Sequence, residues 1–188
     1  DDVFEKILNS DIEKIRKTLE ESNREDFYNA VDTIISAKRI YIVGTRSAAV
    51  LARFIAYYFN LMFENARFIN TASTSEMFEQ IMRIEKGDVM IGISFPRYSK
   101  QTAKALSFAA GNGAKVVAIT DSQNSPIAEY STHTLIAKSD MASFVDSLVA
   151  PMSLINALII AIGIKKQDEI KTNFEHLEDI WDKYDVYE

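Results

Sequence analysis

The sequence predicts an α/β fold, a three-layer α/β/α sandwich built on a five-stranded parallel sheet and flanked by N- and C-terminal helices. Five short β-rich segments alternate with segments whose apolar residues recur at helical spacing. The central β-rich segments are continuous apolar runs, which is typical of parallel strands covered on both faces. A chain of 188 residues, 47% of them hydrophobic, is long enough to bury a substantial core.

Two helices are expected before the first strand. Apolar residues at helical spacing predict the first over residues 2–21. Asn23 can cap the second helix, with Asp26 in its first turn. The apolar face of this second helix runs from Phe27 to Ile35, and the helix is expected to end by residue 37.

In the rest of the chain, strands and helices mostly alternate. The predicted strands cover residues 39–43, 66–70, 88–94, 114–120 and 133–138. The predicted helices cover residues 47–62, 73–84, 99–113, 145–163 and 166–184. Ser73 and Glu76 have the spacing of a capping box at the start of the second of these helices.

Composition argues against several kinds of site. The chain has no cysteine and only two histidines, His133 and His176, which argues against a metal site, and no cofactor is expected. A net charge of −6 argues against a nucleic-acid face on this domain. The longest apolar stretch, residues 150–164, is interrupted by Pro151 and by polar residues, so it predicts a buried helix. No signal peptide is recognisable, and a cytoplasmic location is expected.

The loop after the first strand reads GTRSA, residues 44–48. In open α/β sheets, ligands bind beyond the carboxyl ends of the strands. Gly44 allows the backbone to approach a ligand closely, Arg46 brings a positive charge, and Ser47 brings a hydroxyl. The N–H groups at the start of the following helix also attract anions. The loop therefore fits an anion site, and a capped turn with a solvated Arg46 fits as well.

The loop after the third strand reads SFPRYSKQT, residues 94–102. It combines hydroxyl and cationic side chains, which together suit a phosphate. A helix cap with two surface cations is the alternative. The two loops follow neighbouring strands in the expected order, so they can face one site. The expected ligand-binding residues of the two loops are Gly44, Arg46, Ser47, Ser94, Arg97, Ser99 and Thr102.

Two further groups of polar residues carry weaker signals. Asp121 could contact a sugar hydroxyl, but its Asp-Ser context is ordinary turn chemistry. Four residues after the fifth strand could line a pocket, but we expect them to cap the following helix. These four residues are Ser139, Asp140, Ser143 and Asp146.

The loop sequences resemble those of a known family. The GTRSA loop, the segment ISFPRYSKQT and the segment AITDSQNSPIA at residues 118–128 resemble the sugar isomerase (SIS) domain. More narrowly, they resemble the effector domain of RpiR-type bacterial transcription regulators. The resemblance covers about residues 23–165. It implies a five-stranded parallel sheet in a helical sandwich, the SIS fold, that binds a phosphorylated sugar.

The resemblance also implies a domain organisation. In such regulators an N-terminal helix-turn-helix domain reads DNA. The chain starts at Asp1, without a methionine, directly in a helical pattern. We therefore expect residues 1–22 to connect to a helix-turn-helix domain absent from this chain, and residues 23–188 to form the SIS domain. DNA would be contacted only through the missing domain, no membrane contact is expected, and a homodimer or homotetramer is expected.

Carried over residue by residue, the resemblance assigns the phosphate loop. Ser99 and Thr102 stand where the SGxT motif of the family has its serine and threonine. Arg97, Tyr98 and Lys100 depart from the common pattern of the family, in which a small or amide residue and glycine are usual. In the first loop, Ala48 stands where the family has a serine, and the serine of this chain lies one position earlier.

The residues favour a sensor over an enzyme. Aldose–ketose isomerisation needs a base that moves a proton, usually a carboxylate or a histidine. The helix predicted at 47–62 has no acidic residue, the helix at 145–163 has only Asp146, and Glu76 is expected to be occupied in its capping box. Two alternatives stay open. One is a phosphosugar isomerase that receives His176 or Glu175 from a second copy, and the other is a dimerisation module with a decayed pocket.

Overall fold

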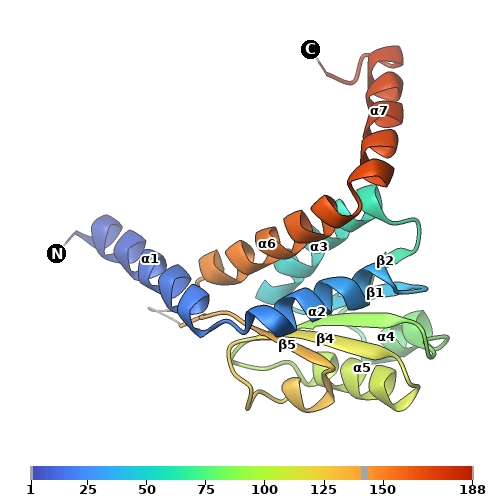
Figure 1. The fold of residues 1–188 in the computed structure, drawn as a ribbon. Helices are drawn as coiled ribbons and strands as arrows, with labels where there is room; N and C mark the ends of the chain where they lie inside the picture. The colour runs from blue at the N-terminus through green and yellow to red at the C-terminus, as the bar shows by residue number, and fades with distance from the viewer. Residues whose placement is uncertain (1, 141–143, 188) are drawn as a thin grey trace.

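Five parallel strands form one sheet, in the order β2-β1-β3-β4-β5 (Figure 1). The strands are Ile40–Gly44 (β1), Ala66–Phe68 (β2), Val89–Ile93 (β3), Lys115–Thr120 (β4) and His133–Ile136 (β5). The structure is a computed structural model that describes residues 2–140 and 144–187. It confirms the predicted five-stranded parallel sheet, and each predicted strand overlaps an observed one.

Helices cover both faces of the sheet, which confirms the three-layer sandwich. On one face pack α2 (Arg24–Ile35), α3 (Ser47–Met62) and α6 (Val149–Lys165). On the other face pack α4 (Thr74–Ile81) and α5 (Lys100–Gly111). A short 3-10 helix, Ala128–Tyr130, lies between β4 and β5, and the helices α1 (Val3–Glu21) and α7 (Gln167–Lys183) flank the sandwich.

The side chains of β1 show why the central strands are apolar at every position. Ile40 and Ile42 belong to the buried cluster that includes α2, α3 and α6. Tyr41 and Val43 belong to the cluster that includes α4 and α5. Successive side chains of a strand point to opposite faces, so a strand with helices on both sides needs apolar residues throughout.

The strand order reverses at β1, which lies between β2 and β3. The chain runs from β1 to β2 on one side and then crosses to β3 on the other. Gly44 and Ile93, the last residues of β1 and β3, are partners in the strand register. The loops after these two strands therefore leave the sheet next to each other, at the kind of switch point where open α/β sheets bind ligands.

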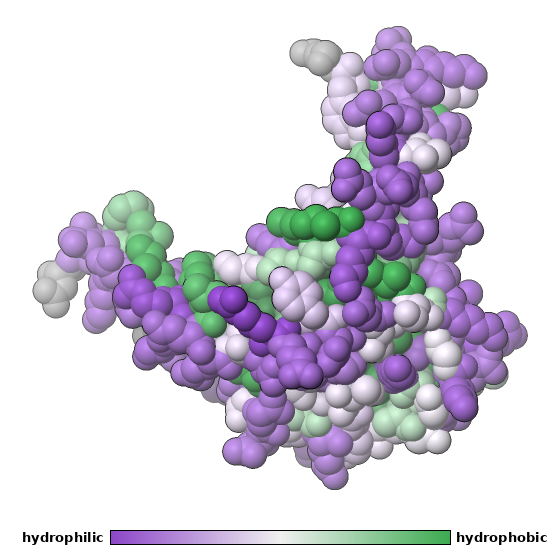
Figure 2. All heavy atoms as spheres, viewed as in Figure 1, coloured by the Kyte–Doolittle hydropathy of each residue, from purple (hydrophilic) through white to green (hydrophobic). Residues whose placement is uncertain are grey.

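The first and last helices project from the sandwich (Figure 1). α1 buries Lys14 and Thr18, whereas Phe4, Leu8 and Leu19 lie in an exposed apolar stripe (Figure 2). α7 has no buried residue and meets α6 at 96°. No single helix in the described residues is long and apolar enough to cross a membrane, and α6 with α7 match a span in length and composition only as a bent pair.

The start of α2 agrees with the sequence prediction, and the start of α6 does not. Asn23 caps α2 as predicted, because its side-chain oxygen accepts a hydrogen bond of 3.0 Å from the backbone N–H of Asp26. The helix predicted to start at residue 145 starts instead at Val149. Of the residues before it, Phe144 and Asp146 line the cavity described next.

Candidate functional site

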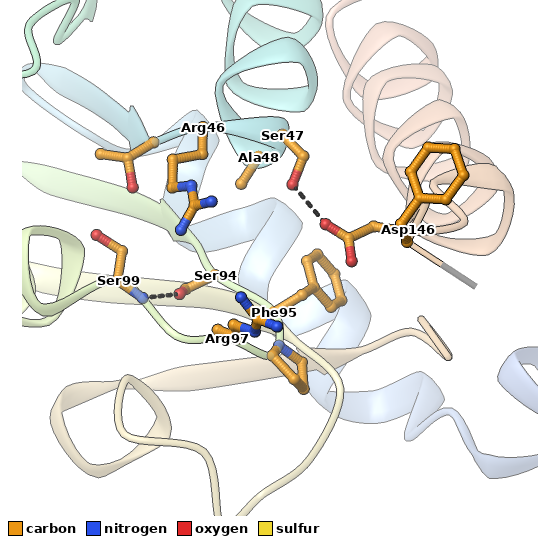
Figure 3. A pocket seen from close by; sticks show the side chains of 11 residues that line it. Arg46, Ser47, Ala48, Ser94, Phe95, Arg97, Ser99 and Asp146 are labelled. Carbon is orange, nitrogen blue, oxygen red and sulfur yellow. Dashed lines mark hydrogen bonds between the residues drawn. The ribbon is translucent and has the colours of Figure 1, made fainter. Parts of the chain in front are cut away.

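A cavity of about 610 Å³ opens at the switch point, beyond the ends of β1 and β3 (Figure 3). Its walls contain residues 45–48, from the β1–α3 loop and the first turn of α3, residues 94–97 and Ser99 of the β3–α5 loop, and Phe144 and Asp146 before α6. The structure therefore brings both loops that the sequence singled out to one cavity. The sequence-derived candidates that line it are Arg46, Ser47, Ser94, Arg97 and Ser99.

The β1–α3 loop is a tight turn that leaves the start of α3 open. A Cβ at Gly44 would lie 2.7 Å from the carbonyl oxygen of Ala48, so only glycine permits this approach. Arg46 has φ +57° and ψ −127°, a conformation that costs a non-glycine residue roughly 1–3 kcal/mol. Arg46 is also the N-cap residue of α3, and its side chain makes no capping hydrogen bond. The first N–H groups of α3 are therefore available to an anion.

The β3–α5 loop is ordered by its own serines. Ser94 is 2% exposed, and its Oγ accepts a hydrogen bond of 3.0 Å from the backbone N–H of Ser99. The Oγ of Ser99 in turn caps α5 by accepting a hydrogen bond of 3.2 Å from the N–H of Thr102. Within residues 2–140 and 144–187 neither serine hydroxyl donates a hydrogen bond, so both protons can be offered to an anion.

Two of the expected ligand-binding residues do not line this cavity. Gly44 contributes to an adjoining cavity that also contains Arg46 and Ser99. Thr102 lines neither cavity, because its side chain is fully buried. Among the described residues the Oγ1 of Thr102 has no hydrogen-bond partner. The spacing of the loop thus places Ser99, and not Thr102, at the cavity wall.

The charges of the cavity are mostly positive. Arg46 and Arg97 are both exposed, and neither guanidinium enters an ion pair within the part of the chain that the structure describes. Guanidinium groups bind phosphate oxygens through directed hydrogen bonds. Among the lining residues that the structure describes, the one acidic side chain is that of Asp146. The cavity can therefore attract an anion and still present a carboxylate to another part of the same molecule.

Asp146 is a residue for which the sequence interpretation was wrong. We expected it to cap the following helix, but the N-cap residue of α6 is Leu148, which makes no side-chain capping bond. The Oδ2 of Asp146 instead accepts a hydrogen bond of 2.9 Å from the hydroxyl of Ser47 (Figure 3). Ser139 donates to the carbonyl oxygen of Ser147 at 3.2 Å and does not cap α6 either.

The other two residues of that predicted capping group give no support to it. Asp140 is exposed and lines neither cavity. Ser143 lies outside the described residues. The segment before α6 is therefore a wall of the cavity more than the start of a helix.

The adjoining cavity brings Glu76 close to the candidate site, because Arg46 and Ser99 line both spaces. The N–H of Glu76 donates to the Oγ of Ser73 at 3.4 Å, as a capping box requires. The carboxylate of Glu76 does not return the bond to Ser73, however, and accepts one of 2.5 Å from the hydroxyl of Thr71. The predicted capping box is therefore only half formed, and Glu76 lines the adjoining cavity.

Tyr98 and Asp121 connect the ends of β3 and β4. The hydroxyl of Tyr98 donates a hydrogen bond of 2.7 Å to the Oδ1 of Asp121. Burial of the ring, followed by this bond to a carboxylate, raises the pKa of Tyr98 to about 12. The sequence left Asp121 as a turn residue. The structure shows that it holds Tyr98, a departure from the family motif, and thereby fixes the loop that carries Ser99.

Sequence reasoning missed part of the site. The polar segment 70–76 after β2 carries Thr71 and Glu76, and its hydroxyl-rich composition was a signal that the loop after this strand also faces the cavity. His176 lies exposed on α7 and lines neither cavity. Among the described residues, no group of three or more metal-ligating side chains could hold a metal ion.

Sequence relatives of the chain include transcription regulators. The chain is 26% identical over 184 residues to an uncharacterized HTH-type transcriptional regulator of Caldanaerobacter subterraneus subsp. tengcongensis, which covers 95% of this chain and 64% of the relative. The chain thus spans less than two thirds of the length of this relative.

Solved structures with the same fold include regulators and an enzyme. The sugar isomerase domain of an RpiR transcription factor from Sphaerobacter thermophilus matches with a TM-score of 0.90 at 24% identity, covering 95% of this chain and 99% of that one. Vibrio vulnificus NanR complexed with ManNAc-6P matches with a TM-score of 0.83 at 18% identity, covering 97% and 70%. Phosphoheptose isomerase GmhA from Neisseria gonorrhoeae matches with a TM-score of 0.72 at 17% identity, covering 85% and 96%.

A family model identifies the fold more directly. The model of the SIS domain matches residues 33–161, which include all five strands and both loops of the cavity. The sheet order, the covered faces and the loops at the switch point agree with that match. The chain therefore belongs to the SIS domain family and resembles the SIS domains of RpiR- and NanR-type transcription regulators.

Proposed function

We propose that this chain is the effector domain of a bacterial transcription regulator and that it binds a sugar phosphate without converting it. The observation that carries the proposal is the cavity shared by the two loops. It combines the guanidinium groups of Arg46 and Arg97, the hydroxyls of Ser94 and Ser99, and the uncapped start of α3. The similarity in fold to NanR, whose structure contains ManNAc-6P, supports a phosphosugar as the ligand.

The contacts of α1 support a route by which binding could be relayed. The hydroxyl of Ser147 donates a hydrogen bond of 2.6 Å to Asp11 on α1. The N–H of Lys138 donates one of 3.0 Å to the Oγ1 of Thr18, also on α1. Lys138 and Ser147, which lie before and after Asp146 in the chain, are therefore both bonded to α1. A ligand that binds one position of the Asp146 segment more tightly than another would thereby move α1.

The wider organisation follows as part of the same proposal. Residues 1–22 would connect to an N-terminal helix-turn-helix domain in a longer, cytoplasmic protein. The exposed apolar stripe of α1 supports a homodimer or homotetramer, and so does an apolar groove lined by Tyr58, Ile160, Ile164 and Phe174. DNA would be contacted by the helix-turn-helix domain and not by this acidic domain.

Calorimetry with a panel of sugar phosphates tests the proposal. The panel contains glucose 6-phosphate, glucosamine 6-phosphate and N-acetylmannosamine 6-phosphate, and methyl phosphate serves as the bare anion. Binding without turnover supports a sensor, and failure of every sugar phosphate to bind contradicts it. Ser99→Ala should weaken binding about ten-fold. Asn23→Ala removes a comparable helix cap far from the cavity, so it should lower stability by about 1 kcal/mol and leave affinity unchanged.

A phosphosugar isomerase is the second candidate, because the carboxylate of Glu76 lies in the adjoining cavity with Arg46 and Ser99. A carboxylate in that place can act as the base that moves a proton between carbons. NMR of each sugar phosphate incubated with the protein would show aldose–ketose exchange. Exchange that is lost in Glu76→Gln would establish the enzyme, and the absence of exchange with ligands that bind leaves the sensor.

A further inference from the structure

The carboxylate of Asp146 lies on the side of the cavity next to α6 (Figure 3). Phe95 and Phe144 line the same cavity. Among the described residues Asp146 forms no ion pair, and its recorded hydrogen-bond partner is the hydroxyl of Ser47. A carboxylate can accept several hydrogen bonds, so Asp146 keeps capacity for donors from a ligand.

A phosphate cannot be the group that Asp146 binds, because two anions in one cavity repel each other. Asp146 also holds the single proton of the Ser47 hydroxyl, which is then not available to a phosphate. An anion that enters alone therefore meets repulsion and finds one hydroxyl already engaged. A ligand that carries a hydrogen-bond donor as well as a phosphate can replace Ser47 on Asp146 and release that hydroxyl toward its own phosphate.

We propose that Asp146 is the specificity-determining residue of the site. It accepts a hydrogen bond from a hydroxyl or ammonium group on the sugar, and it weakens the binding of anions that lack such a donor. This inference rests on the proposed binding of a sugar phosphate. The exposed ring of Phe144 suits the C–H surface of a sugar ring, and the carboxylate of Asp146 suits its polar groups. The site thereby discriminates sugar phosphates from inorganic phosphate in two ways: Asp146 repels the bare anion, and it accepts a hydrogen bond from the sugar.

The inference makes Asp146→Asn act in opposite directions on two ligands. For the sugar phosphate of the panel that binds most tightly, the dissociation constant should rise about ten-fold, because a hydrogen bond to a charged acceptor is lost. For methyl phosphate it should fall several-fold, because the repulsion is removed and Ser47 is released. Asp146→Ala should show the same pair of shifts without introducing an amide donor. Asp140→Asn removes the same charge from an exposed position outside the cavity and should change neither constant.

Calorimetry on the intact chain measures both constants for each variant. Weakening of both ligands by the same factor would overturn the inference, because Asp146 would then only shape the loop. If the wild-type chain binds no sugar phosphate more tightly than methyl phosphate, the proposed function itself fails. A loss confined to glucosamine 6-phosphate would identify an ammonium as the donor, and an equal loss with glucose 6-phosphate would identify a hydroxyl. Both of these outcomes support the inference.

Discussion

The conformation of Arg46 yields a prediction in which stability and binding move in opposite directions. Its φ of +57° and ψ of −127° cost a residue with a Cβ roughly 1–3 kcal/mol. Glycine adopts this conformation without strain, but its greater freedom in the unfolded chain takes back roughly 0.5–1 kcal/mol. The side chain is exposed and forms no ion pair among the described residues, so its loss removes little else. Arg46→Gly should therefore raise the free energy of unfolding by about 1 kcal/mol.

Urea and thermal unfolding measure this effect, and a change of about 1 kcal/mol corresponds to a rise in Tm of about 2–4 °C for a domain of this size. Arg46→Ala is the matched variant, because it also removes the guanidinium but keeps the Cβ, and it should show no such gain. Both variants should lose about ten-fold in affinity for a sugar phosphate. A glycine variant no more stable than the alanine variant would refute the strain at this position.

Three further predictions concern the loops around the cavity. Tyr98→Phe should abolish a tyrosine titration near pH 12 in ultraviolet absorbance. Burial and then the bond to Asp121 raise this pKa above the unfolded value near 10, so the stability linked to the protonated phenol is present below pH 10 and lost as pH rises to 12. Gly44→Ala should lower the free energy of unfolding, measured in urea titrations, by about 1–3 kcal/mol, because its Cβ would lie 2.7 Å from a carbonyl oxygen. Gly111→Ala is the control, and it should raise the free energy of unfolding by about 0.5–1 kcal/mol because the space around its Cβ is open. Ser147→Ala should leave phosphosugar affinity within about two-fold but should increase hydrogen exchange in α1, because the bond to Asp11 is lost. Unchanged exchange would contradict the relay.

The fold could be predicted because its signals are local. The apolar runs of β1 and β3, the cap at Asn23 and the alternation of strands and helices can each be recognised within a few neighbouring residues. The order of the strands placed the two candidate loops side by side, and the structure agrees. Helix starts were less predictable. The start of α6 was predicted at residue 145, but the helix starts at Val149, and Asp146, expected to cap it, bonds to the distant Ser47 instead.

The residues of the site that the sequence did not reveal depend on contacts between distant segments. Ser47 and Asp146 are separated by 99 positions, and nothing in the local pattern of either one indicates the other. Glu76 has the spacing of a capping box, but a hydroxyl from the preceding loop competes for its carboxylate. Thr102 has the spacing of a motif residue, yet the packing of α5 buries it. Spacing therefore identified two loops that line one cavity, but not every side chain that faces it.

The short segment 144–148 has one consequence for how such a domain can diversify or be redesigned. Asp146 faces the cavity, and the next residue, Ser147, is bonded to α1. Under the proposed function, neighbouring positions therefore have separate roles: Asp146 in ligand recognition and Ser147 in the relay to α1. Substitutions can alter the two independently, whereas shortening the segment by one residue would disturb both. A biosensor with a new ligand but the original output would best be sought by varying the cavity side of this segment and keeping Ser147.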